Sequence, residues 1–451
     1  MNRREFIKKF SLLSLGLATI PKLLGNTKSK NKIPGLIKDP KGILDLPSGF
    51  TYSIISREGD LMDDGLLVPS NADGMTCIPM DKDRVVLIRN HEIGHIPRLS
   101  IFFKNNPFGK HYRKYKKENA DKFYDIKGKK THCFGGTTSI VYNLKTEQVE
   151  SQYLSLAGTL VNCSGGQTPW NTWISCEETT LREGTGITKN HGYNFEVIPS
   201  IIPKLNKATP LKDMGRFRHE GVAFDPDLGY VYQTEDRSDG LFYRFIPDSK
   251  NELYKGGKLQ ILSFKDWRGI DTRNWNKKNI DIGKKYQVRW INIDNADSKK
   301  DDLRYRGKNL GGAIFARGEG IFLSDNMLFF TATTGGKNKT GQIWRYIPNV
   351  NNTGGEIELF YESSSSDVLN LPDNIIISPN GNILLCEDGK GRDRLVCIKP
   401  DKSIFYLANN AYNHQEFAGL CFSPDNEILF INIYNPTMTI AIKGSWNNLY
   451  F

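Results

Sequence analysis

Beyond residue 25, the apolar residues of the chain fall in short runs rather than at the spacing of an amphipathic helix. These runs are rich in Ile, Val, Phe, Tyr and Thr, and Gly, Asn, Asp and Pro separate them. Short runs of β-branched and aromatic residues bounded by turn residues are typical of strands. The pattern therefore predicts an all-β chain.

The runs form a repeating unit of strand, turn, strand and polar end. Repeated hairpins of this kind indicate a β-propeller, with a pair of β-sandwiches or a β-helix as the alternatives. The spacing of the copies is irregular, so we expect a six-bladed β-propeller with large inter-blade insertions at 96–131 and 250–310. Clear copies occupy residues 221–236, 320–334, 374–388 and 419–433, a weaker copy spans 74–92, and a sixth ends at Cys176-Glu177-Glu178.

Acidic residues recur at both ends of these repeats. In a propeller these ends converge near one axis, and many carboxylates in one place raise one another's pKa unless cations neutralise them. The set therefore predicts a metal site, although a single pair such as Glu387-Asp388 is equally compatible with a solvated turn. The second strands end in Asn90-His91-Glu92, Cys176-Glu177-Glu178, Glu235-Asp236 and Glu387-Asp388, and the first strands open at Asp73-Gly74, His219-Glu220-Gly221, Arg317-Gly318-Glu319-Gly320, Pro372-Asp373-Asn374 and Glu416-Phe417-Ala418-Gly419.

The segment Asn162–Glu178 combines a Gly-Gly turn with a short strand that ends on a thiol and two carboxylates, Cys176, Glu177 and Glu178. Oxygen-rich sites favour calcium, whereas a thiolate favours a transition metal such as iron. We interpret Cys176 as the sulfur donor of an otherwise oxygen-lined site. The alternative is a surface Glu-Glu pair beside a buried structural cysteine.

The N-terminus carries Arg3-Arg4 and then an apolar run from Phe10 to Ile20. A basic start followed by a short apolar run is typical of an export signal, and the paired arginines indicate the twin-arginine route. An ordinary signal or an uncleaved anchor is the alternative. We expect a signal peptide and short linker at 1–30, a single propeller domain at 31–451, no stable membrane insertion, and a periplasmic or extracellular protein.

The formal net charge of +11 falls to +7 when the five basic residues and Glu5 of residues 1–25 are removed, which leaves 56 basic and 49 acidic side chains. The basic residues are scattered and lack interleaved aromatic residues, which argues against nucleic-acid binding, while a modest positive field favours small anionic substrates. The seven cysteines form no Cys-x-x-Cys motif, which excludes zinc-ribbon and thioredoxin sites. We expect a monomer.

At Asn162–Glu178, Gly215–Gly221, Arg317–Gly320, Leu371–Asn374 and Cys386–Gly389 the chain resembles the PhoX family of bacterial alkaline phosphatases. The resemblance extends from Asp73-Gly74-Met75 to Ile440-Ala441-Ile442. It implies a propeller phosphatase, exported by the twin-arginine machinery, that hydrolyses phosphate monoesters with Fe³⁺ and Ca²⁺ in the channel mouth.

The resemblance also implies a set of site residues. Cys176 would be the thiolate ligand of iron, and Glu220 and Glu319 would be carboxylate ligands. Arg317 would clamp the substrate phosphate, unless it forms only a salt bridge that orients Glu319. The remaining iron and calcium ligands would be Glu92, Glu177, Glu178, Asp373 and Glu387.

Two other functions remain open at this stage. The first is a calcium-dependent propeller phosphodiesterase or lactonase, against which a cysteine ligand would argue because calcium takes oxygen donors. The second is a metal-stabilised exported propeller without catalytic activity.

Overall fold

The structure is a computed structural model, and it describes residues 35–97, 107–126, 131–184, 186–349, 353–391 and 393–446. The signal peptide and short linker expected at 1–30 lie outside these residues. Among the described residues, no helix combines the length and the apolar character needed to cross a membrane.

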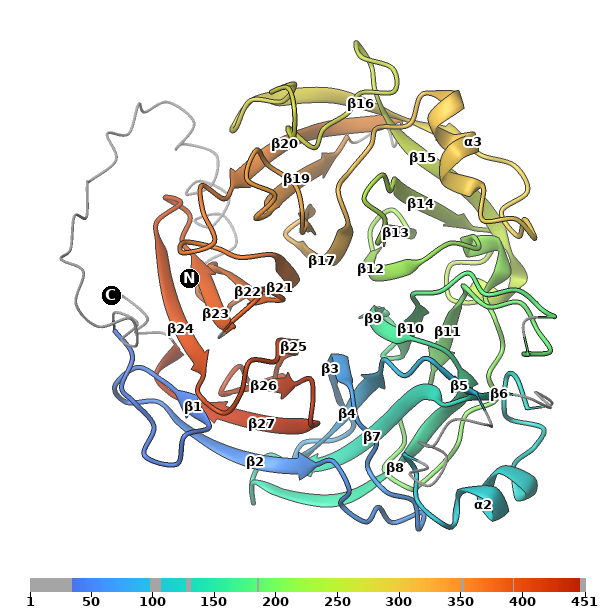
Figure 1. Cartoon of the computed structure of the whole chain (residues 1–451), viewed down its shortest axis with the longest axis vertical. Coiled ribbons are helices and arrows are strands. Elements are labelled where there is room, and N and C mark those ends of the chain that lie inside the picture. The colour runs from blue at the N-terminus through green and yellow to red at the C-terminus, as the bar shows by residue number, and fades with distance from the viewer. Residues whose placement is uncertain are drawn as a thin grey trace.

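Six strands form a closed ring around a central axis (Figure 1), and each contacts the next around the ring. The all-β propeller architecture predicted from the sequence is therefore confirmed. In ring order these inner strands are β3 (Ala72–Pro79), β9 (Asn162–Gln167), β12 (His219–Asp225), β17 (Gly318–Ser324), β21 (Pro372–Ile377) and β25 (Phe417–Phe422).

A second strand pairs antiparallel with each inner strand, and further strands continue each sheet outward. The turn between the first two strands places the start of the inner strand and the end of the second strand at the same end of the propeller. The second strands are β4 (Arg84–His91), β10 (Trp173–Glu177), β13 (Tyr230–Glu235), β18 (Met327–Ala332), β22 (Ile383–Glu387) and β26 (Ile428–Ile433). The outer strands are β7 (Gly135–Asn143), β8 (Gln148–Thr159), β11 (Asn194–Val197), β14 (Phe242–Pro247), β15 (Gly257–Phe264), β19 (Gln342–Pro348), β20 (Gly354–Glu362), β23 (Arg394–Ile398), β24 (Ile404–Asn410) and β27 (Met438–Lys443).

The two ends of the described chain are joined by a strand ladder. Strand β2 (Thr51–Arg57) pairs with β27 of the last sheet, from Thr51 opposite Lys443 to Arg57 opposite Met438. Strand β1 (Leu44–Asp45) adds to β24 in the preceding sheet. The ring is thus closed by backbone hydrogen bonds as well as by side-chain packing.

Hydrogen bonding alone does not separate six blades. Strand β16 (Lys285–Asn292) pairs with both β15 and β20, so two blade-like groups merge into one nine-stranded sheet. The count of six blades therefore remains a prediction. The expected insertion at 250–310 is wrong in part, because β15 within it is an ordinary outer strand. The same stretch also holds β16, a 3₁₀ turn at Leu253–Lys255 and α3 (Leu303–Leu310).

The region expected as an insertion at 96–131 does lie between β4 and β7. Its described part holds α2 (Tyr112–Glu118), and the two-stranded sheet of β5 (His95–Pro97) and β6 (Thr131–Cys133) flanks it. The side chains of Phe108, Tyr112 and Phe123 are buried in the apolar cluster that fixes this segment to the propeller. The segment therefore packs on the propeller's outside (Figure 1).

Candidate metal centre at the channel mouth

Each of the six inner strands carries the same irregularity near its start. Two residues of the inner strand face one residue of the second strand. In β3, for example, Ala72 pairs with His91 and Met75 pairs with Arg89, so Asp73 and Gly74 together face Asn90. Such a bulge bends the strand and re-aims a side chain, and bulges of this kind occur often beside active sites. We call the first skipped residue the ring position; its six occupants are Asp73, Cys163, Glu220, Glu319, Asp373 and Gly419.

Three ring-position carboxylates converge in space. Each of Glu220, Glu319 and Asp373 offers an oxygen, and these oxygens all lie within 4.8 Å of one another. The Asp73 atom Oδ1 is buried and has no hydrogen-bond partner among the described residues. Three closely spaced, buried carboxylates, together with a buried oxygen that has no hydrogen-bond partner, fit the ligand sphere of a cation.

A close approach of neighbouring inner strands brings these side chains together. A Cβ atom on Gly320 would lie 2.6 Å from the Asp373 carbonyl oxygen, and one on Gly221 would lie 2.9 Å from the Glu319 carbonyl oxygen. Both distances are shorter than real Cβ contacts, and the backbone atoms involved could move away only if the neighbouring strand moved with them. Glycine is therefore required at positions 221 and 320 for the convergence of the three carboxylates.

A second layer of acids comes from the residue that directly follows each second strand, which we call the outer position. In five of the six inner hairpins, the backbone N–H of the outer-position residue donates a hydrogen bond to the carbonyl oxygen of the residue two before the ring position. An example is the hydrogen bond from Glu92 to Asn71 (2.9 Å). Tyr434 donates its hydroxyl hydrogen to Glu92 (2.6 Å), and Glu416 shares a hydrogen bond with Asp388. The five outer-position residues are Glu92, Glu178, Asp236, Thr333 and Asp388.

Burial and mutual repulsion disfavour the charged form of these acids. Burial, and then the charges of its neighbours, raise the pKa of Glu220 well above its ordinary value, and the same holds for Glu319 and Asp73. Burial and the charge of Asp388 raise the pKa of Asp373 to about 7. Bound cations would remove this cost by pairing with the ionised carboxylates.

The ring position of β9 holds Cys163, whereas the sulfur donor expected from the sequence is Cys176. Burial, and then the charges of neighbours that include Glu220, Glu178 and Asp73, raise the pKa of the Cys163 thiol, which donates a hydrogen bond to the His219 carbonyl oxygen (3.2 Å). Burial alone raises the pKa of Cys176, whose side chain packs among Ile174, Met214 and other apolar residues. The structure therefore does not bring Cys176 into the cluster.

Two other expected ligands point into the sheets instead of toward the axis. Glu177 accepts hydrogen bonds from the backbone N–H groups of Leu160 (2.9 Å) and Gly192 (2.8 Å). Glu387 forms a two-fold ion pair with Arg394 through Nε and Nη2, each at 2.6 Å. Because side chains alternate along a strand, the next residue, Glu178 or Asp388, faces the mouth.

Of the expected ligands, the structure thus brings Glu220, Glu319, Asp373, Glu92 and Glu178 together, and it places the side chains of Cys176, Glu177 and Glu387 elsewhere. Five further residues belong to the cluster: Asp73, Cys163, Asp236, Asp388 and Glu416. Four of the five are acids that belong to the repeated pattern of strand ends in the sequence. That pattern included them, but it did not identify them as ligands.

Arg317 lies at the edge of this cluster, as expected. Its Nε donates to Asp236 (2.8 Å), its Nη2 lies 2.7 Å from a Glu319 oxygen, and its side chain is 31% exposed. Arg218 stands at the same place one hairpin earlier, two residues before the ring position. Its guanidinium pairs with the Glu178 carboxylate, and its side chain is 32% exposed. The charge of Glu319 raises the pKa of Arg317, so both guanidinium groups are charged at the mouth.

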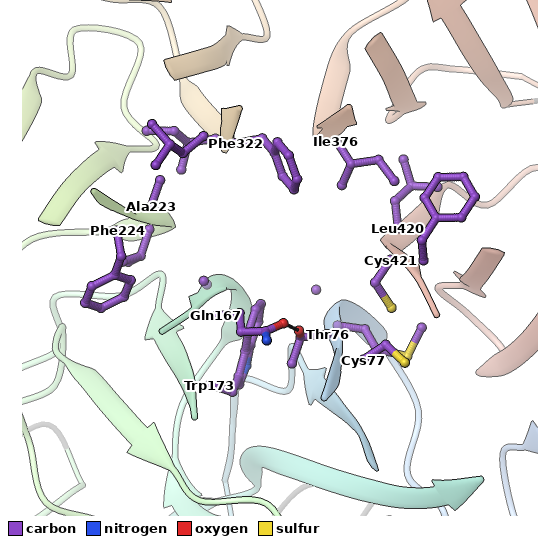
Figure 2. Close-up of a pocket in the computed structure, with 18 of the residues that line it drawn as sticks. Thr76, Cys77, Gln167, Trp173, Ala223, Phe224, Phe322, Ile376, Leu420 and Cys421 are labelled. Carbon is purple, nitrogen blue, oxygen red and sulfur yellow. Dashed lines mark hydrogen bonds between the residues drawn. The ribbon is translucent and has the colours of Figure 1, made fainter. Parts of the chain in front are cut away.

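The central channel continues behind the acids as a cavity of about 670 Å³ (Figure 2). Its walls are the later residues of the inner strands, including Phe224, Phe322 and Leu420, and Thr76 donates a hydrogen bond to Gln167 (2.7 Å) within it. No ring-position acid lines this cavity. The acids therefore lie at the mouth and outside this cavity.

Comparisons with known proteins relate the chain to one family and to solved structures of similar fold. The family model for alkaline phosphatase PhoX matches residues 32–437. Pseudomonas fluorescens PhoX in complex with vanadate, a transition state analogue, has a similar structure, with a TM-score of 0.64, 18% identity, and coverage of 89% of this chain and 96% of that chain. The periplasmic gluconolactonase PpgL of Pseudomonas aeruginosa matches with a TM-score of 0.40 at 10% identity, over 86% of this chain and 90% of that chain. The search of curated proteins gives no match.

Proposed function

Because the chain belongs to the alkaline phosphatase PhoX family, whose members are metal-dependent phosphoric monoester hydrolases, we propose that it hydrolyses phosphate monoesters at the channel mouth with Fe³⁺ and Ca²⁺. The proposal rests on the residue types found at the ring position. Five consecutive inner strands place an acid or a thiol at one structural position, and three of the carboxylates approach within 4.8 Å.

The donor set fits two kinds of metal. We assign iron to the side that holds Cys163, Glu220 and Glu319, because a thiolate suits a transition metal. Calcium would take the oxygen-only side, where the donors are Asp73, Glu92, Glu178, Asp373 and Asp388. When bound, such cations neutralise the phosphate and the charge that develops on its oxygens in the transition state.

The chain's own side chains would orient the substrate. Arg317 and Arg218 are charged and partly exposed, and a guanidinium binds two phosphate oxygens in a fixed fork. Asp236 holds the Arg317 side chain, and Glu178 holds that of Arg218. These carboxylates would orient the two guanidinium groups before the substrate binds.

Metal analysis and a phosphatase assay test the proposal together. We expect the purified protein to contain iron and calcium, to release phosphate from a simple aryl phosphate, and to lose this activity after calcium chelation. Glu319→Gln should abolish activity, whereas Glu356→Gln, which changes an exposed acid paired with Lys285, should leave it unchanged. Protein with calcium but no iron and no phosphate release would contradict the proposal, and turnover of a lactone by that protein would favour the lactonase alternative.

Export by the twin-arginine route is part of the proposal. Arg3→Lys combined with Arg4→Lys should leave the protein in the cytoplasm, because the twin-arginine machinery requires the arginine pair. Cell fractionation measures the outcome. Unchanged export of the double variant would instead show that an ordinary signal is at work.

A further inference from the structure

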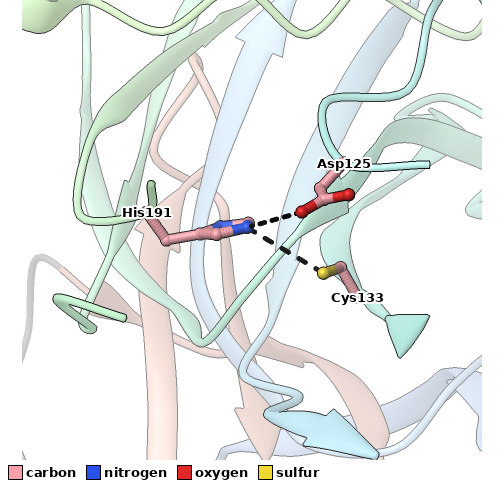
Figure 3. Close-up of side chains that lie close together, drawn as sticks. All are labelled: Asp125, Cys133 and His191. Carbon is pink, nitrogen blue, oxygen red and sulfur yellow. Dashed lines mark hydrogen bonds and ion pairs between the residues drawn. The ribbon is translucent and has the colours of Figure 1, made fainter. Parts of the chain in front are cut away.

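Asp125, Cys133 and His191 form a second cluster of side chains of the types that bind metals (Figure 3). Asp125 follows α2, Cys133 ends β6, and His191 lies in the loop between β10 and β11. All three side chains are buried, and an oxygen, a sulfur and a nitrogen from them lie within 4.8 Å of one another. Thiolate, imidazole and carboxylate are the three donor types that bind zinc in proteins.

The spacing within this cluster is wider than hydrogen bonds require. The His191 atom Nε2 lies 3.7 Å from Asp125 Oδ2 and 3.9 Å from Cys133 Sγ. A charge-assisted hydrogen bond between imidazole and carboxylate closes to about 2.7–2.9 Å. The ligand atoms of a tetrahedral zinc ion are about 3.3–3.8 Å apart, as follows from its bond lengths. The distance between His191 and Asp125 lies within this range, and the distance between His191 and Cys133 lies just above it.

The groups are also held in the orientation that a ligand needs. The other ring nitrogen of His191, Nδ1, lies 2.6 Å from Glu177, and this carboxylate is itself fixed by backbone N–H groups. A carboxylate at one imidazole nitrogen makes that nitrogen the donor and leaves the lone pair of the other free for a metal. Glu177 therefore orients His191 toward Cys133 and Asp125.

Asp125 is oriented in the same way and keeps room for a further partner. It accepts hydrogen bonds from the backbone N–H groups of Thr188 (2.6 Å) and Lys189 (3.0 Å) and from the Thr188 hydroxyl (2.6 Å). A carboxylate has about four acceptor sites, two on each oxygen, so the remaining site is on Oδ1. Oδ2, which lies 3.7 Å from His191 Nε2, already accepts both backbone hydrogen bonds.

We propose that Asp125, Cys133 and His191 bind a zinc ion, separate from the channel-mouth metals. Binding displaces the thiol proton of Cys133, and a water molecule takes the fourth position. The ion joins the segment between β4 and β7 to the loop that follows β10. Through His191 and Glu177 it also steadies the end of β10, directly before Glu178 of the mouth cluster. The proposal does not depend on the phosphatase activity.

Anomalous diffraction from crystals of the wild-type holoenzyme soaked in zinc tests the proposal directly. We expect a peak at the zinc absorption edge between Cys133 Sγ, His191 Nε2 and Asp125. An empty site at saturating zinc would overturn the proposal. The cluster would then be an ion pair between a His191 imidazolium and two carboxylates, because the charges of Glu177 and Asp125 also favour the protonated imidazole.

Zinc content of variants gives an independent readout. Cys133→Ser and Asp125→Asn should each bind one zinc fewer per chain than the wild type under equal loading. Cys421→Ser, which changes a thiol in the channel wall, should bind as much zinc as the wild type. A Cys133→Ser variant that folds and keeps the full zinc content would contradict the proposal, and if it fails to fold, the diffraction experiment on the wild type still decides.

Discussion

Arg218 and Arg317 occupy the same structural position before two neighbouring inner strands, β12 and β17. Each precedes the ring position by two residues, and its backbone carbonyl accepts a hydrogen bond from the outer-position residue of the same hairpin, Asp236 (3.2 Å) or Thr333 (2.9 Å). Each side chain then reaches the outer-position acid of the preceding hairpin, Glu178 or Asp236. The repeat therefore presents two similar guanidinium groups to one cluster of acids.

This relationship predicts that both arginines contact the substrate phosphate. Arg317→Lys and Arg218→Lys keep the charge but lose the two-pronged geometry, so we expect kcat/KM to fall about 10- to 100-fold and inhibition by inorganic phosphate to weaken. Steady-state kinetics with an aryl phosphate measure both. Arg84→Lys, at an exposed pair with Asp81 in the β3–β4 turn, is the matched control and should change neither. An Arg218→Lys variant with wild-type phosphate inhibition would remove Arg218 from the site.

The alternation of side chains at the end of β22 predicts opposite effects for adjacent acids. Glu387→Gln breaks a buried ion pair with Arg394, so the free energy of unfolding should fall by about 3–5 kcal/mol while the metal content stays unchanged. Asp388→Asn should lower the metal content with a smaller loss of stability. Denaturant unfolding and elemental analysis of both variants measure the two effects. Metal loss in Glu387→Gln with full stability would show that Glu387, and not Asp388, is the ligand.

Gly320 should be intolerant of a methyl group. In Gly320→Ala the new Cβ would meet the Asp373 carbonyl oxygen, so two inner strands must separate, at a cost of about 1–3 kcal/mol. We expect reduced metal binding together with the loss of stability, since Glu319 and Asp373 move apart. Gly94→Ala, where the added atom meets open space, is the control. Equal metal content and equal melting temperatures in the two variants would contradict the close approach.

Asp393 gives a prediction for the pH dependence of stability. Burial raises its pKa to about 8, and one of its oxygens has no hydrogen-bond partner in the described part of the chain. Between about pH 4 and 8 the folded state holds a proton that the unfolded state has released, so this residue lowers stability progressively as pH rises. Asp393→Asn should raise the melting temperature near pH 8 and change it little near pH 4. A stabilisation that is equal at both pH values would show that Asp393 is ionised in the folded protein.

The sequence predicted the propeller because hairpin repeats with polar ends are a local pattern. The selection of Arg317, Glu220 and Glu319 came from the resemblance to the PhoX family and not from the hairpin pattern alone. The nine-stranded sheet was not predictable, because the pairing of β16 with β20 joins segments more than sixty residues apart, and local periodicity carries no information on such pairs.

The sequence alone did not indicate which of Cys163 and Cys176 faces the central axis. Both thiols lie in one hairpin, and the strand register with its bulge decides which of them faces the axis. The same one-residue ambiguity separates Glu177 from Glu178. An alignment of the inner strands on the small residue that follows the ring position, as in Asp73-Gly74, Cys163-Ser164 and Glu220-Gly221, would have selected Cys163.

The most direct test of this account compares the two cysteines of that hairpin. Cys163→Ser and Cys176→Ser are purified in parallel, and the iron content, calcium content and phosphate release of each are measured. We predict that Cys163→Ser loses iron and at least about 100-fold in phosphatase activity, whereas Cys176→Ser keeps both and loses only stability. Iron and activity retained in Cys163→Ser but lost in a folded Cys176→Ser would contradict the assignment of the ring position as the metal-binding layer.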